Sequence, residues 1–560
     1  MDINDLLCGP PPESIALFRL PPELLASIYS HLTNTDIGNL RLTCSTASFI
    51  VRLRFSRVFL SPNPVNLRVF CAVADHPTIR LQIQEIIYDD ARLGDFKNWK
   101  HYIHEYPDEG DADAEELVSD DDADAGYSFE SRFRAARNAN KEILRDRNAG
   151  DEPTLPQHVY QKRMASEELP WEVVLDTYCS LVSEQNEMIA TGADIHVLKY
   201  GLTRFPALRR ITVTPATHGY LYTPLYRTPM IRLLPDGFNY PLPRGWPTTR
   251  VGPPNPLTPA IGASDGQVAA NHWDWRGLLS VLQTVADSLR HGNIPSLLEL
   301  VIDVHGLDTG VNPHMFAQDG PDYDNWAAIL RQPGFSRLDL PLMVGGLMRD
   351  GWGSLTNGYF RSLLAEAADL EHFYLRSDEK MGAVAWMPKT ATTRYMPLCS
   401  ILPLDQWKRL RHFGLSNLQV QSKDVVSALA ALPSTLQSVE LSFLQFVETP
   451  EDSIQNLLYE MNARLEWKNR DPAARPKAVV GLLYGPVDLP ARGIWFSEEV
   501  SEFLYHGGQN PIQWGNNLVP VGVGVVKDEF DPAYERPNAD HDTLIKLGFY
   551  PEDELMRRSS

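Results

Sequence analysis

The chain has 560 residues, a formal net charge of -21 at pH 7, and a hydrophobic fraction of 43%. This length suits two or more domains or one extended repeat structure, with ample apolar residues for a core. The negative charge argues against nonspecific binding to nucleic acid or anionic membranes, because such binding needs clustered Lys and Arg.

The cysteines and the first residues bear on the cellular compartment. The cysteines are scattered and include no CxxC pair, which argues against a disulfide framework; they are Cys8, Cys44, Cys71, Cys179 and Cys399. The N-terminus, MDINDLLCGPPP, lacks a basic region followed by an apolar run, and no run of about eighteen apolar residues occurs. We therefore expect a cytoplasmic or nuclear protein without a membrane partner.

The stretch RLPPELLASIYSHLTNTDIGNLRLTC, at 19–44, predicts two short amphipathic helices. Pro21 and Pro22 suit the first turn of a helix, where their missing amide hydrogens have no intrahelical acceptor. The apolar residues that recur there at helical spacing are Leu24, Leu25, Ile28 and Leu32. Thr35 suits the cap of a second helix, whose apolar side carries Ile37, Leu40 and Cys44.

A third apolar segment, ASFIVRLRFSRVF, follows these helices. A module of this size buries only a modest part of its surface, so such short apolar helices need something to pack against. Either the rest of the chain or a second protein can supply that surface.

The same stretch resembles the F-box, with its Leu-Pro-x-Glu opening, Leu/Ile helix, Asp-(Leu/Ile) start of a second helix, and Leu-Arg-Leu-x-Cys. The positions that fit are Leu20, Pro21, Glu23, Ile28, Leu32, Asp36, Ile37, Leu40, Arg41, Leu42 and Cys44. Many F-boxes carry a Trp three residues after the Cys, where this chain has Ala47, with Phe49 nearby. The continuation is similar to the segment that follows the F-box in many fungal F-box proteins, so the resemblance covers 18–93.

The resemblance implies that the module binds a Skp-type adaptor, which links it to a cullin in an SCF ubiquitin ligase. The residues expected to face the adaptor or to form the core of the module are Leu20, Pro21, Leu24, Leu25, Ile28, Leu32, Ile37, Leu40 and Cys44. The sequence offers no way to divide these two roles.

An acidic stretch follows, in which about half of the residues from Glu105 to Asp124 are acidic and none is basic. Like charges at this density repel one another and keep a segment solvated, which predicts a disordered surface insertion; a binding tail is the alternative. The next stretch, FESRFRAARNANKEILRDRN, predicts a solvated helix.

The rest of the chain repeats a loose Leu-x-x-Leu-x-Leu phrase, which predicts short strands with one buried face. Its occurrences begin at Ile83, Leu208, Leu297, Phe335, Leu370, Leu410, Leu436 and, more weakly, Val479. Helical patterns lie between them: WRGLLSVLQTVADSLRHG, GYFRSLLAEAADL, SKDVVSALAALPSTL and EDSIQNLLYEMNARLEWKN. This alternation predicts a parallel sheet built from stacked units.

The phrase is similar to the leucine-rich repeat, whose strands line the inner face of a curved solenoid. Its spacing here is irregular: Ile83 and Leu208 stand 125 residues apart, whereas regular repeats run about 20–29 residues. A proline-rich stretch at 223–262 predicts an extended surface loop, because proline disfavours helix. In the alternative, its aromatic residues pack the loop against the solenoid.

Residues that alternate with the buried ones on the predicted strands face the inner surface. The candidates for contact with a protein substrate are Arg210, Arg337, Asp339, His372, Tyr374, Arg376, His412 and Glu440, with Thr212, Glu299 and Asp303 on the same face. Their mixed charge suits protein recognition and equally suits a solvated face. Phosphate recognition would require clustered arginines, and along the sequence they are scattered.

The sequence contains no phosphate-cradling GxxxxGK[ST], no HExxH zinc helix and no GxSxG nucleophile turn. We expect no catalytic residue, metal or cofactor, although a spatially assembled triad has no signal in sequence. The predicted fold is α/β, with N-terminal all-α F-box helices followed by an irregular leucine-rich-repeat-like solenoid with long loop insertions.

The expected organisation is a flexible N-terminus (1–17), the F-box (18–60), a linker helix and first repeat strand (61–104), an acidic disordered insertion (105–155), the repeat domain (156–530) and a C-terminal tail (531–560). The expected function is a substrate-recognition subunit of a cullin-type ligase. The alternatives are a scaffold that binds the adaptor without a cullin, or an enzyme with its site in the inserted loops.

Overall fold

The structure is a computed structural model of the chain. It describes residues 17, 20–32, 34–51, 53–94, 129–148, 155–247, 274–294, 297–344, 355–378, 397–446, 452–483, 492–512 and 523–538.

The described strands form a large, open and mostly parallel sheet of twelve strands. From β1 to β11 each strand pairs in parallel with the next in the sheet, and β12 to β14 extend one edge as antiparallel strands. In sheet order the strands are β1 Arg57–Leu60, β2 Glu85–Asp89, β3 Arg210–Thr214, β4 Glu299–Ile302, β5 Arg337–Leu342, β6 His372–Ser377, β7 His412–Ser416, β9 Ser438–Ser442, β11 Lys477–Leu483, β12 Arg492–Phe496, β13 Val525–Asp528 and β14 Asp531–Pro537. A separate two-stranded ribbon pairs β8 (Gln419–Val420) with β10 (Gln445–Phe446).

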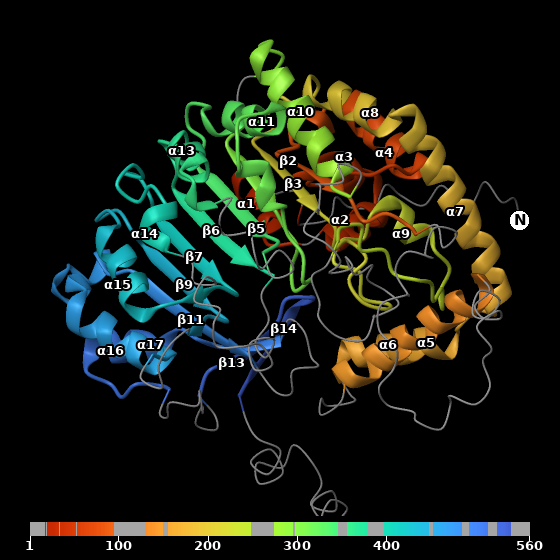
Figure 1. Cartoon of the computed structure of the whole chain (residues 1–560). Coiled ribbons are helices and arrows are strands. Elements are labelled where there is room, and N and C mark those ends of the chain that lie inside the picture. Colours follow the sequence, from red (N-terminus) through yellow and green to blue (C-terminus); the bar gives the residue numbers. More distant parts are fainter. Residues whose placement is uncertain are drawn as a thin grey trace, which may run out of the picture.

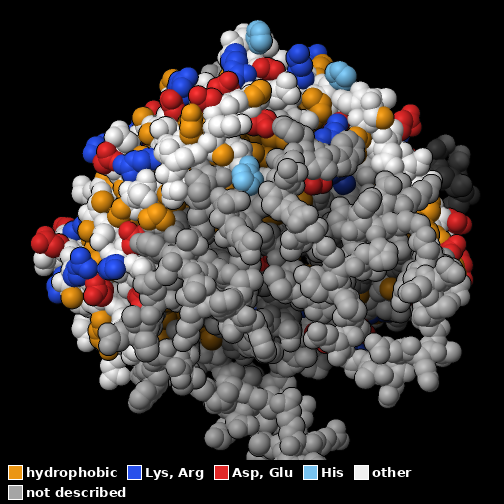
Figure 2. Space-filling model, viewed as in Figure 1, with side chains coloured by type: hydrophobic (Ala, Val, Ile, Leu, Met, Phe, Trp, Pro, Cys, Tyr) orange, Lys and Arg blue, Asp and Glu red, His pale blue; other side chains and the backbone are white. Residues whose placement is uncertain are grey.

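Helices range along the outer side of this curved sheet (Figure 1). Those that pack on it are α4 Pro64–Asp75, α8 Ala193–Leu202, α10 Arg276–Arg290, α11 Pro321–Leu330, α13 Tyr359–Ala365, α14 Leu398–Ile401, α15 Ser422–Ala431, α16 Ile454–Arg464 and α17 Glu498–His506. Neighbouring parallel strands need such helical crossover connections, because a tight turn cannot carry the chain back to the end of the sheet at which the next strand begins. Lys, Arg, Asp and Glu are interspersed over these outer helices, as expected of their solvent-facing side (Figure 2).

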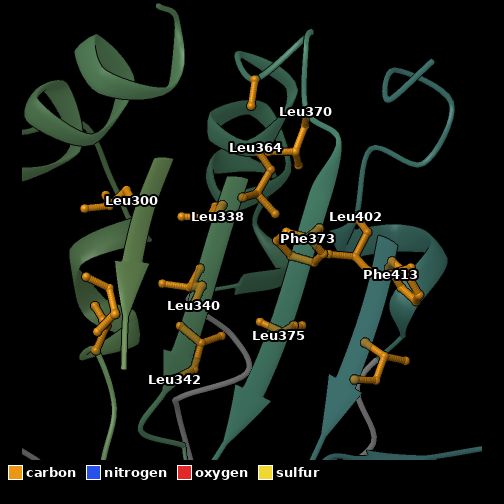
Figure 3. Close-up of a cluster of buried hydrophobic side chains, with 14 of the residues drawn as sticks. Leu300, Leu338, Leu340, Leu342, Leu364, Leu370, Phe373, Leu375, Leu402 and Phe413 are labelled. Carbon is orange, nitrogen blue, oxygen red and sulfur yellow. The ribbon is translucent and has the colours of Figure 1, made fainter. Parts of the chain in front are cut away.

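The core lies between the sheet and the outer helices. Equivalent positions of neighbouring strands are in register, so that Leu338 pairs with Phe373 and Phe373 with Phe413. These side chains point to the same side of the sheet and meet residues of the crossover segments such as Leu364 and Leu402 (Figure 3). Burying large side chains at about 25 cal/mol per Å² of apolar surface is the main source of stability here.

The sequence predictions of strands and helices are largely confirmed. Each of the first seven phrases lies on its predicted strand, from β2 to β9, and the four helical patterns coincide with α10, α13, α15 and α16. The eighth, weaker phrase is confirmed at Leu482, which is buried on β11, and wrong at Val479, while Tyr484 lies outside the described residues. Ala478 and Val480 continue the buried rows of Val439 and Leu441, whereas Val479 pairs with Glu440 on the opposite face.

The predicted third apolar segment divides into a helix and a strand. Its first part lies in α3, and its last residues form β1, which belongs to the sheet. The boundary expected at residue 60 therefore falls inside the α/β part of the molecule. Likewise β14 lies within the expected C-terminal tail, of which 539–560 lie outside the described residues.

Two inserted segments each pack one side against the rest of the chain. Helix α5 (Phe129–Asn148), expected to be solvated and placed inside a disordered insertion, buries Phe133, Ala136 and Asn140. The proline-rich stretch was predicted to be a surface loop, but up to Pro247 it folds inward: α9 (Pro229–Leu233) is followed by Phe238, Tyr240 and Leu242. These residues share a second core with α5 and α7 (Trp171–Thr191), so the alternative of aromatic anchors is confirmed there. The acidic stretch at 105–124 lies outside the described residues, as does the rest of the proline-rich stretch, 248–262.

A contact far apart in sequence ties the insertion helices to the last strands. Arg147 at the end of α5 forms a buried ion pair with Asp528 at the end of β13, and Arg492 Nε donates to the same carboxylate oxygen over 2.9 Å. The Arg147 guanidinium also lies 4.1 Å from the Tyr220 ring centre, and that ring packs on Phe530 at 4.5 Å. Because α5 follows β2 and β13 lies near the opposite edge, this contact joins the two halves of the sheet. Helix α6 (Pro156–Ser166) lies beside α5 (Figure 1).

Candidate functional site

The three N-terminal helices, α1 (Pro22–Ser30), α2 (Asn34–Thr43) and α3 (Ser45–Ile50), share a small core of their own. Its buried members are Ile37, Ala47 and Val51, and the partly buried residues around them are Tyr29, Leu32, Leu40, Cys44 and Leu53. None of the described residues of these helices joins the core between the sheet and its outer helices.

The segment that leaves α3 is tied back to the ends of α1 and α2. The Asn34 side-chain amide donates to the Arg54 carbonyl oxygen over 2.6 Å, and its oxygen accepts the Arg54 backbone N–H over 2.9 Å. The Arg54 guanidinium donates to the carbonyl oxygens of Ser30, at 3.0 Å, and of Leu32. These bonds satisfy carbonyl groups at the end of α1 and fix the path of the chain from the helices to β1.

The structure separates the predicted adaptor-facing residues by exposure. Those that are buried or half-buried are Leu20, Leu25, Leu32, Ile37, Leu40 and Cys44, whereas Pro21, Leu24 and Ile28 are exposed. The Cys44 sulfur accepts the Ala47 backbone N–H over 3.4 Å and so caps α3. Leu24 and Ile28, four residues apart on α1, share one side of that helix, with exposed fractions of 52% and 38%.

Further large apolar side chains are exposed on α2 and α3, and they were missing from the predicted set. Leu42 and Phe49 are each 86% exposed, and Ile50 is also exposed. Leu40 and Leu42 stand two residues apart, which places them on different sides of a helix, so a buried Leu40 already implied an outward Leu42. All three helices therefore present apolar side chains to solvent.

A second candidate site lies on the inner face of the sheet. The strand register places charged and imidazole side chains in one row across neighbouring strands, in the order Arg57, Glu85, Arg210, Glu299, Arg337, His372 and His412. Opposite charges thus alternate at the start of the row, an arrangement in which cross-strand neighbours attract each other.

Ion pairs and stacking link this row. Arg210 Nε donates to Glu299 Oε2 over 2.6 Å, and Arg337 holds Asp339 through two bonds of 3.0 and 2.6 Å. His372 Nε2 lies 3.2 Å from Asp339 Oδ1, and the His372 ring stacks on His412 with centroids 4.1 Å apart. Burial and the neighbouring His372 lower the pKa of His412 to about 4.

A cavity of about 290 Å³ opens on this face between β1 and β6. The charged side chains that line it are Arg57, Glu85, Arg210, Asp303, His305, Arg337, Asp339 and Arg376. Tyr226 and Tyr374 also line it, and the absence of a side chain on Gly414 makes room for the Tyr374 ring on the next strand. The cavity is polar and charged on most sides.

Asp303 and His305 follow β4 at the edge of this cavity. His305 Nε2 lies 3.0 Å from Asp303 Oδ2, and its backbone is left-handed, with φ of 47°. Burial alone would raise the pKa of Asp303, but the charge and hydrogen bonds of His305 lower it to about 2. Burial opposes protonation of His305, yet Asp303 raises its pKa, so the pair favours its charged form.

The sequence prediction named part of this site. Of the predicted substrate-facing residues, Arg210, Arg337, Asp339, Tyr374 and Arg376 line the cavity, while His372, His412 and Glu440 lie on strands of the same face beyond it. The lining residues absent from that set include Arg57, Glu85, Tyr226 and His305. Arg57 was missed because β1 carries no Leu-x-x-Leu phrase, and Tyr226 because its segment was expected to be a surface loop.

Within the described part of the chain, no group of three or more His, Cys, Asp or Glu side chains is placed to hold a metal ion. No described helix combines the length and apolar character needed to cross a bilayer.

Comparison with known families identifies the N-terminal helices. Residues 17–57 match the F-box domain family. The match spans α1, α2 and α3 and ends at the first residue of β1, so the chain carries an F-box domain followed by a mixed α/β region. F-box domains typically bind Skp-type adaptors. A search of curated proteins finds no match to this chain.

Proposed function

We propose that this protein is the substrate-recognition subunit of an SCF ubiquitin ligase, in which the F-box binds a Skp-type adaptor and the α/β region holds a protein substrate. The observation that carries the proposal is the exposure of Leu24, Ile28, Leu42 and Phe49 on helices that match the F-box family. Exposed apolar side chains of this size on one small module favour a surface that another protein covers.

The energetics support a partner on these helices. Among the described residues, the core that these helices share has three buried members. The large apolar side chains that these helices expose are Leu24, Ile28, Leu42, Phe49 and Ile50. Burying each of these fully contributes up to about 1.5–3 kcal/mol, which favours an adaptor that covers them.

The substrate side of the proposal is the α/β region. We propose that it is an irregular leucine-rich-repeat-like solenoid that presents its inner face to the substrate. The Leu-x-x-Leu-x-Leu phrase recurs in register on successive parallel strands, which supports this proposal. The row of mixed charges on the inner face of the sheet supports it as well. Mixed charge with Tyr and His suits recognition of a polar protein surface.

The chain itself would supply no catalytic group. The receptor would raise the local concentration of substrate lysines near a ubiquitin-charged enzyme carried elsewhere in the ligase, which is catalysis through effective concentration.

The test is capture of the adaptor by the full chain and by charged variants of exposed residues. In Leu24→Asp/Ile28→Asp and in Phe49→Asp, we expect adaptor affinity to fall about 30-fold or more, as at interface residues worth about 2 kcal/mol or more each. The matched control is Leu233→Asp, since Leu233 is 68% exposed on α9, away from the F-box. Unchanged capture by both F-box variants would refute the proposal.

Recovery of a cullin with the adaptor distinguishes the ligase from the scaffold. If the protein is a receptor, the cullin should be captured together with the adaptor by the wild-type chain and should be absent from the material captured by Phe49→Asp. Adaptor without cullin would leave a two-protein scaffold as the function.

A further inference from the structure

The turn between β13 and β14 reaches back to the cavity on the inner face. Glu529 in this turn accepts a bond of 2.6 Å from Arg376 Nη1, and Arg376 belongs to β6 and lines the cavity. The next residue, Phe530, is buried against Tyr220 and lies beside His305 at 6.3 Å. A carboxylate from a distant part of the chain is thus held at the cavity by one of its arginines.

The contact uses only part of the donor capacity of Arg376. The Arg376 side chain is about nine-tenths buried, and its Nε–H has no acceptor. A guanidinium binds a carboxylate best through two parallel bonds, and a buried donor without an acceptor carries a desolvation cost. Glu529 therefore satisfies Arg376 incompletely.

The other arginines of the cavity differ from Arg376 in their pairing. Arg337 is held by Asp339 through two bonds, and Arg210 by Glu299. These pairs lie on the sheet itself, so their geometry does not depend on the hairpin. Arg376 alone among the three depends on an acid carried by a separate turn.

We propose that this cavity binds an acidic side chain of the substrate and that Glu529 is an internal competitor, which the substrate carboxylate displaces from Arg376. The proposal rests on the proposed function and names the substrate class, a segment bearing Asp or Glu. The exchange keeps the charge of the site balanced, because one carboxylate replaces another. It is favourable because a carboxylate free to approach from the cavity can engage both Nε–H and an Nη–H of Arg376.

The charges of the side chains around the cavity favour an acidic ligand over a basic one. With Glu529 displaced, the positive side chains are Arg57, Arg210, Arg337, Arg376 and the charged His305, against the lining acids Glu85, Asp303 and Asp339 and Glu299, which pairs with Arg210. The Arg57 side chain forms no hydrogen bond or ion pair within the described part of the chain, so its guanidinium is also available to the ligand. An incoming carboxylate meets an excess of positive charge in a protein that is otherwise strongly acidic.

The test is binding of three labelled, capped peptides to the full-length chain, followed by fluorescence anisotropy. One peptide is Gly-Glu-Gly-Glu-Gly, the second carries Gln in place of Glu, and the third carries phosphoserine. We expect the Glu peptide to bind and the Gln peptide to bind at least about tenfold more weakly. In Glu529→Gln the affinity for the Glu peptide should rise about tenfold, which corresponds to the weight of one charge-assisted hydrogen bond.

The matched control is Glu535→Gln, because Glu535 lies exposed on β14 of the same hairpin and pairs with Lys527, outside the cavity. Its affinity for the Glu peptide should equal that of wild type. Arg376→Gln should abolish binding; should that variant fail to fold, the Glu529→Gln result still decides.

Equal binding of the Glu and Gln peptides would overturn the proposal, as would equal affinities of Glu529→Gln and wild type. Binding of the phosphoserine peptide alone would also overturn it, in favour of a phosphate reader. Adaptor capture by the same preparations is scored separately, so that loss of peptide binding with intact capture refutes this inference and leaves the proposed function standing.

Discussion

The F-box helices and the α/β region use their apolar residues in opposite ways. In α1 to α3, Leu24, Leu42 and Phe49 are exposed, while the core that these helices share has Ile37, Ala47 and Val51 as its buried members among the described residues. In the α/β region the large residues of the repeated phrase, such as Phe373 and Phe413, are fully buried. The contrast indicates that the described α/β strands bury their large apolar residues within the chain, whereas the described F-box helices leave several of theirs exposed, as the proposed adaptor interface requires.

The largest effect that tests this comparison is a truncation in the core of the sheet. In Phe373→Ala we expect a loss of about 3–5 kcal/mol in the free energy of unfolding, because the ring is fully buried against Trp407, with centroids 4.6 Å apart. Chemical denaturation measures it. The paired variant Phe49→Ala, on the F-box, should leave this free energy unchanged within about 0.5 kcal/mol. Equal losses in the two variants would contradict the comparison.

A second, smaller effect concerns pH and the inner face of the sheet. The pKa of His412 is about 4 in the folded chain and about 6.5 in an unfolded one, so the unfolded chain binds the proton more tightly. Protonation therefore favours unfolding, and stability is fully present above pH 6.5 and decreases as the pH falls towards 4. In His412→Gln, we expect about 1–3 kcal/mol of this decrease to disappear, measured by denaturation at pH 7 and pH 4.5.

The F-box should show no such dependence on His412. If hydrogen exchange of α1 to α3 changes with the His412→Gln substitution, the two regions are coupled and the comparison fails.

The smallest effect lies at the junction between the two regions. In Asn34→Ala we expect a local loss of about 1–2 kcal/mol, because two hydrogen bonds to the backbone of Arg54 disappear. Hydrogen exchange should become faster in α1 to α3 and stay unchanged in β3 to β9. A matched change at another exposed asparagine side chain, Asn357→Ala, should leave α1 to α3 as in wild type. Faster exchange throughout the sheet would show that the F-box helices stabilise it.

The sequence was sufficient to predict the strands where the phrase is strong. Seven phrases with Leu, Ile, Val, Phe or Tyr at spaced positions predicted β2 to β7 and β9 correctly, because burial on one face requires that alternation. On β11 it was wrong at Val479, because Ala478, Val479 and Val480 are all apolar and the alternation does not reveal which of them is buried. It also failed at β1, a strand of four residues directly after the F-box helices.

The candidate sites were only partly predictable for a different reason. Helical spacing placed Leu24 and Ile28 on an apolar side of α1 without indicating that they are exposed, because their exposure, like that of Phe49, depends on how three helices pack together. The arginines looked scattered because Arg57, Arg210, Arg337 and Arg376 lie on four different strands, and only the register of the sheet brings them around one cavity. Glu529 reaches that cavity from an antiparallel hairpin that the repeat pattern did not predict.

The pair of Arg147 with Asp528 has a consequence for biosynthesis. The two residues stand 381 positions apart, so during translation Arg147 emerges long before its carboxylate exists. Until the last strands leave the ribosome, α5 holds a guanidinium without that counter-charge, and the insertion helices cannot settle on the hairpin. A nascent polypeptide that stops before Asp528 therefore lacks the acid of this contact, so α5 and the hairpin dock only after β13 has been synthesised.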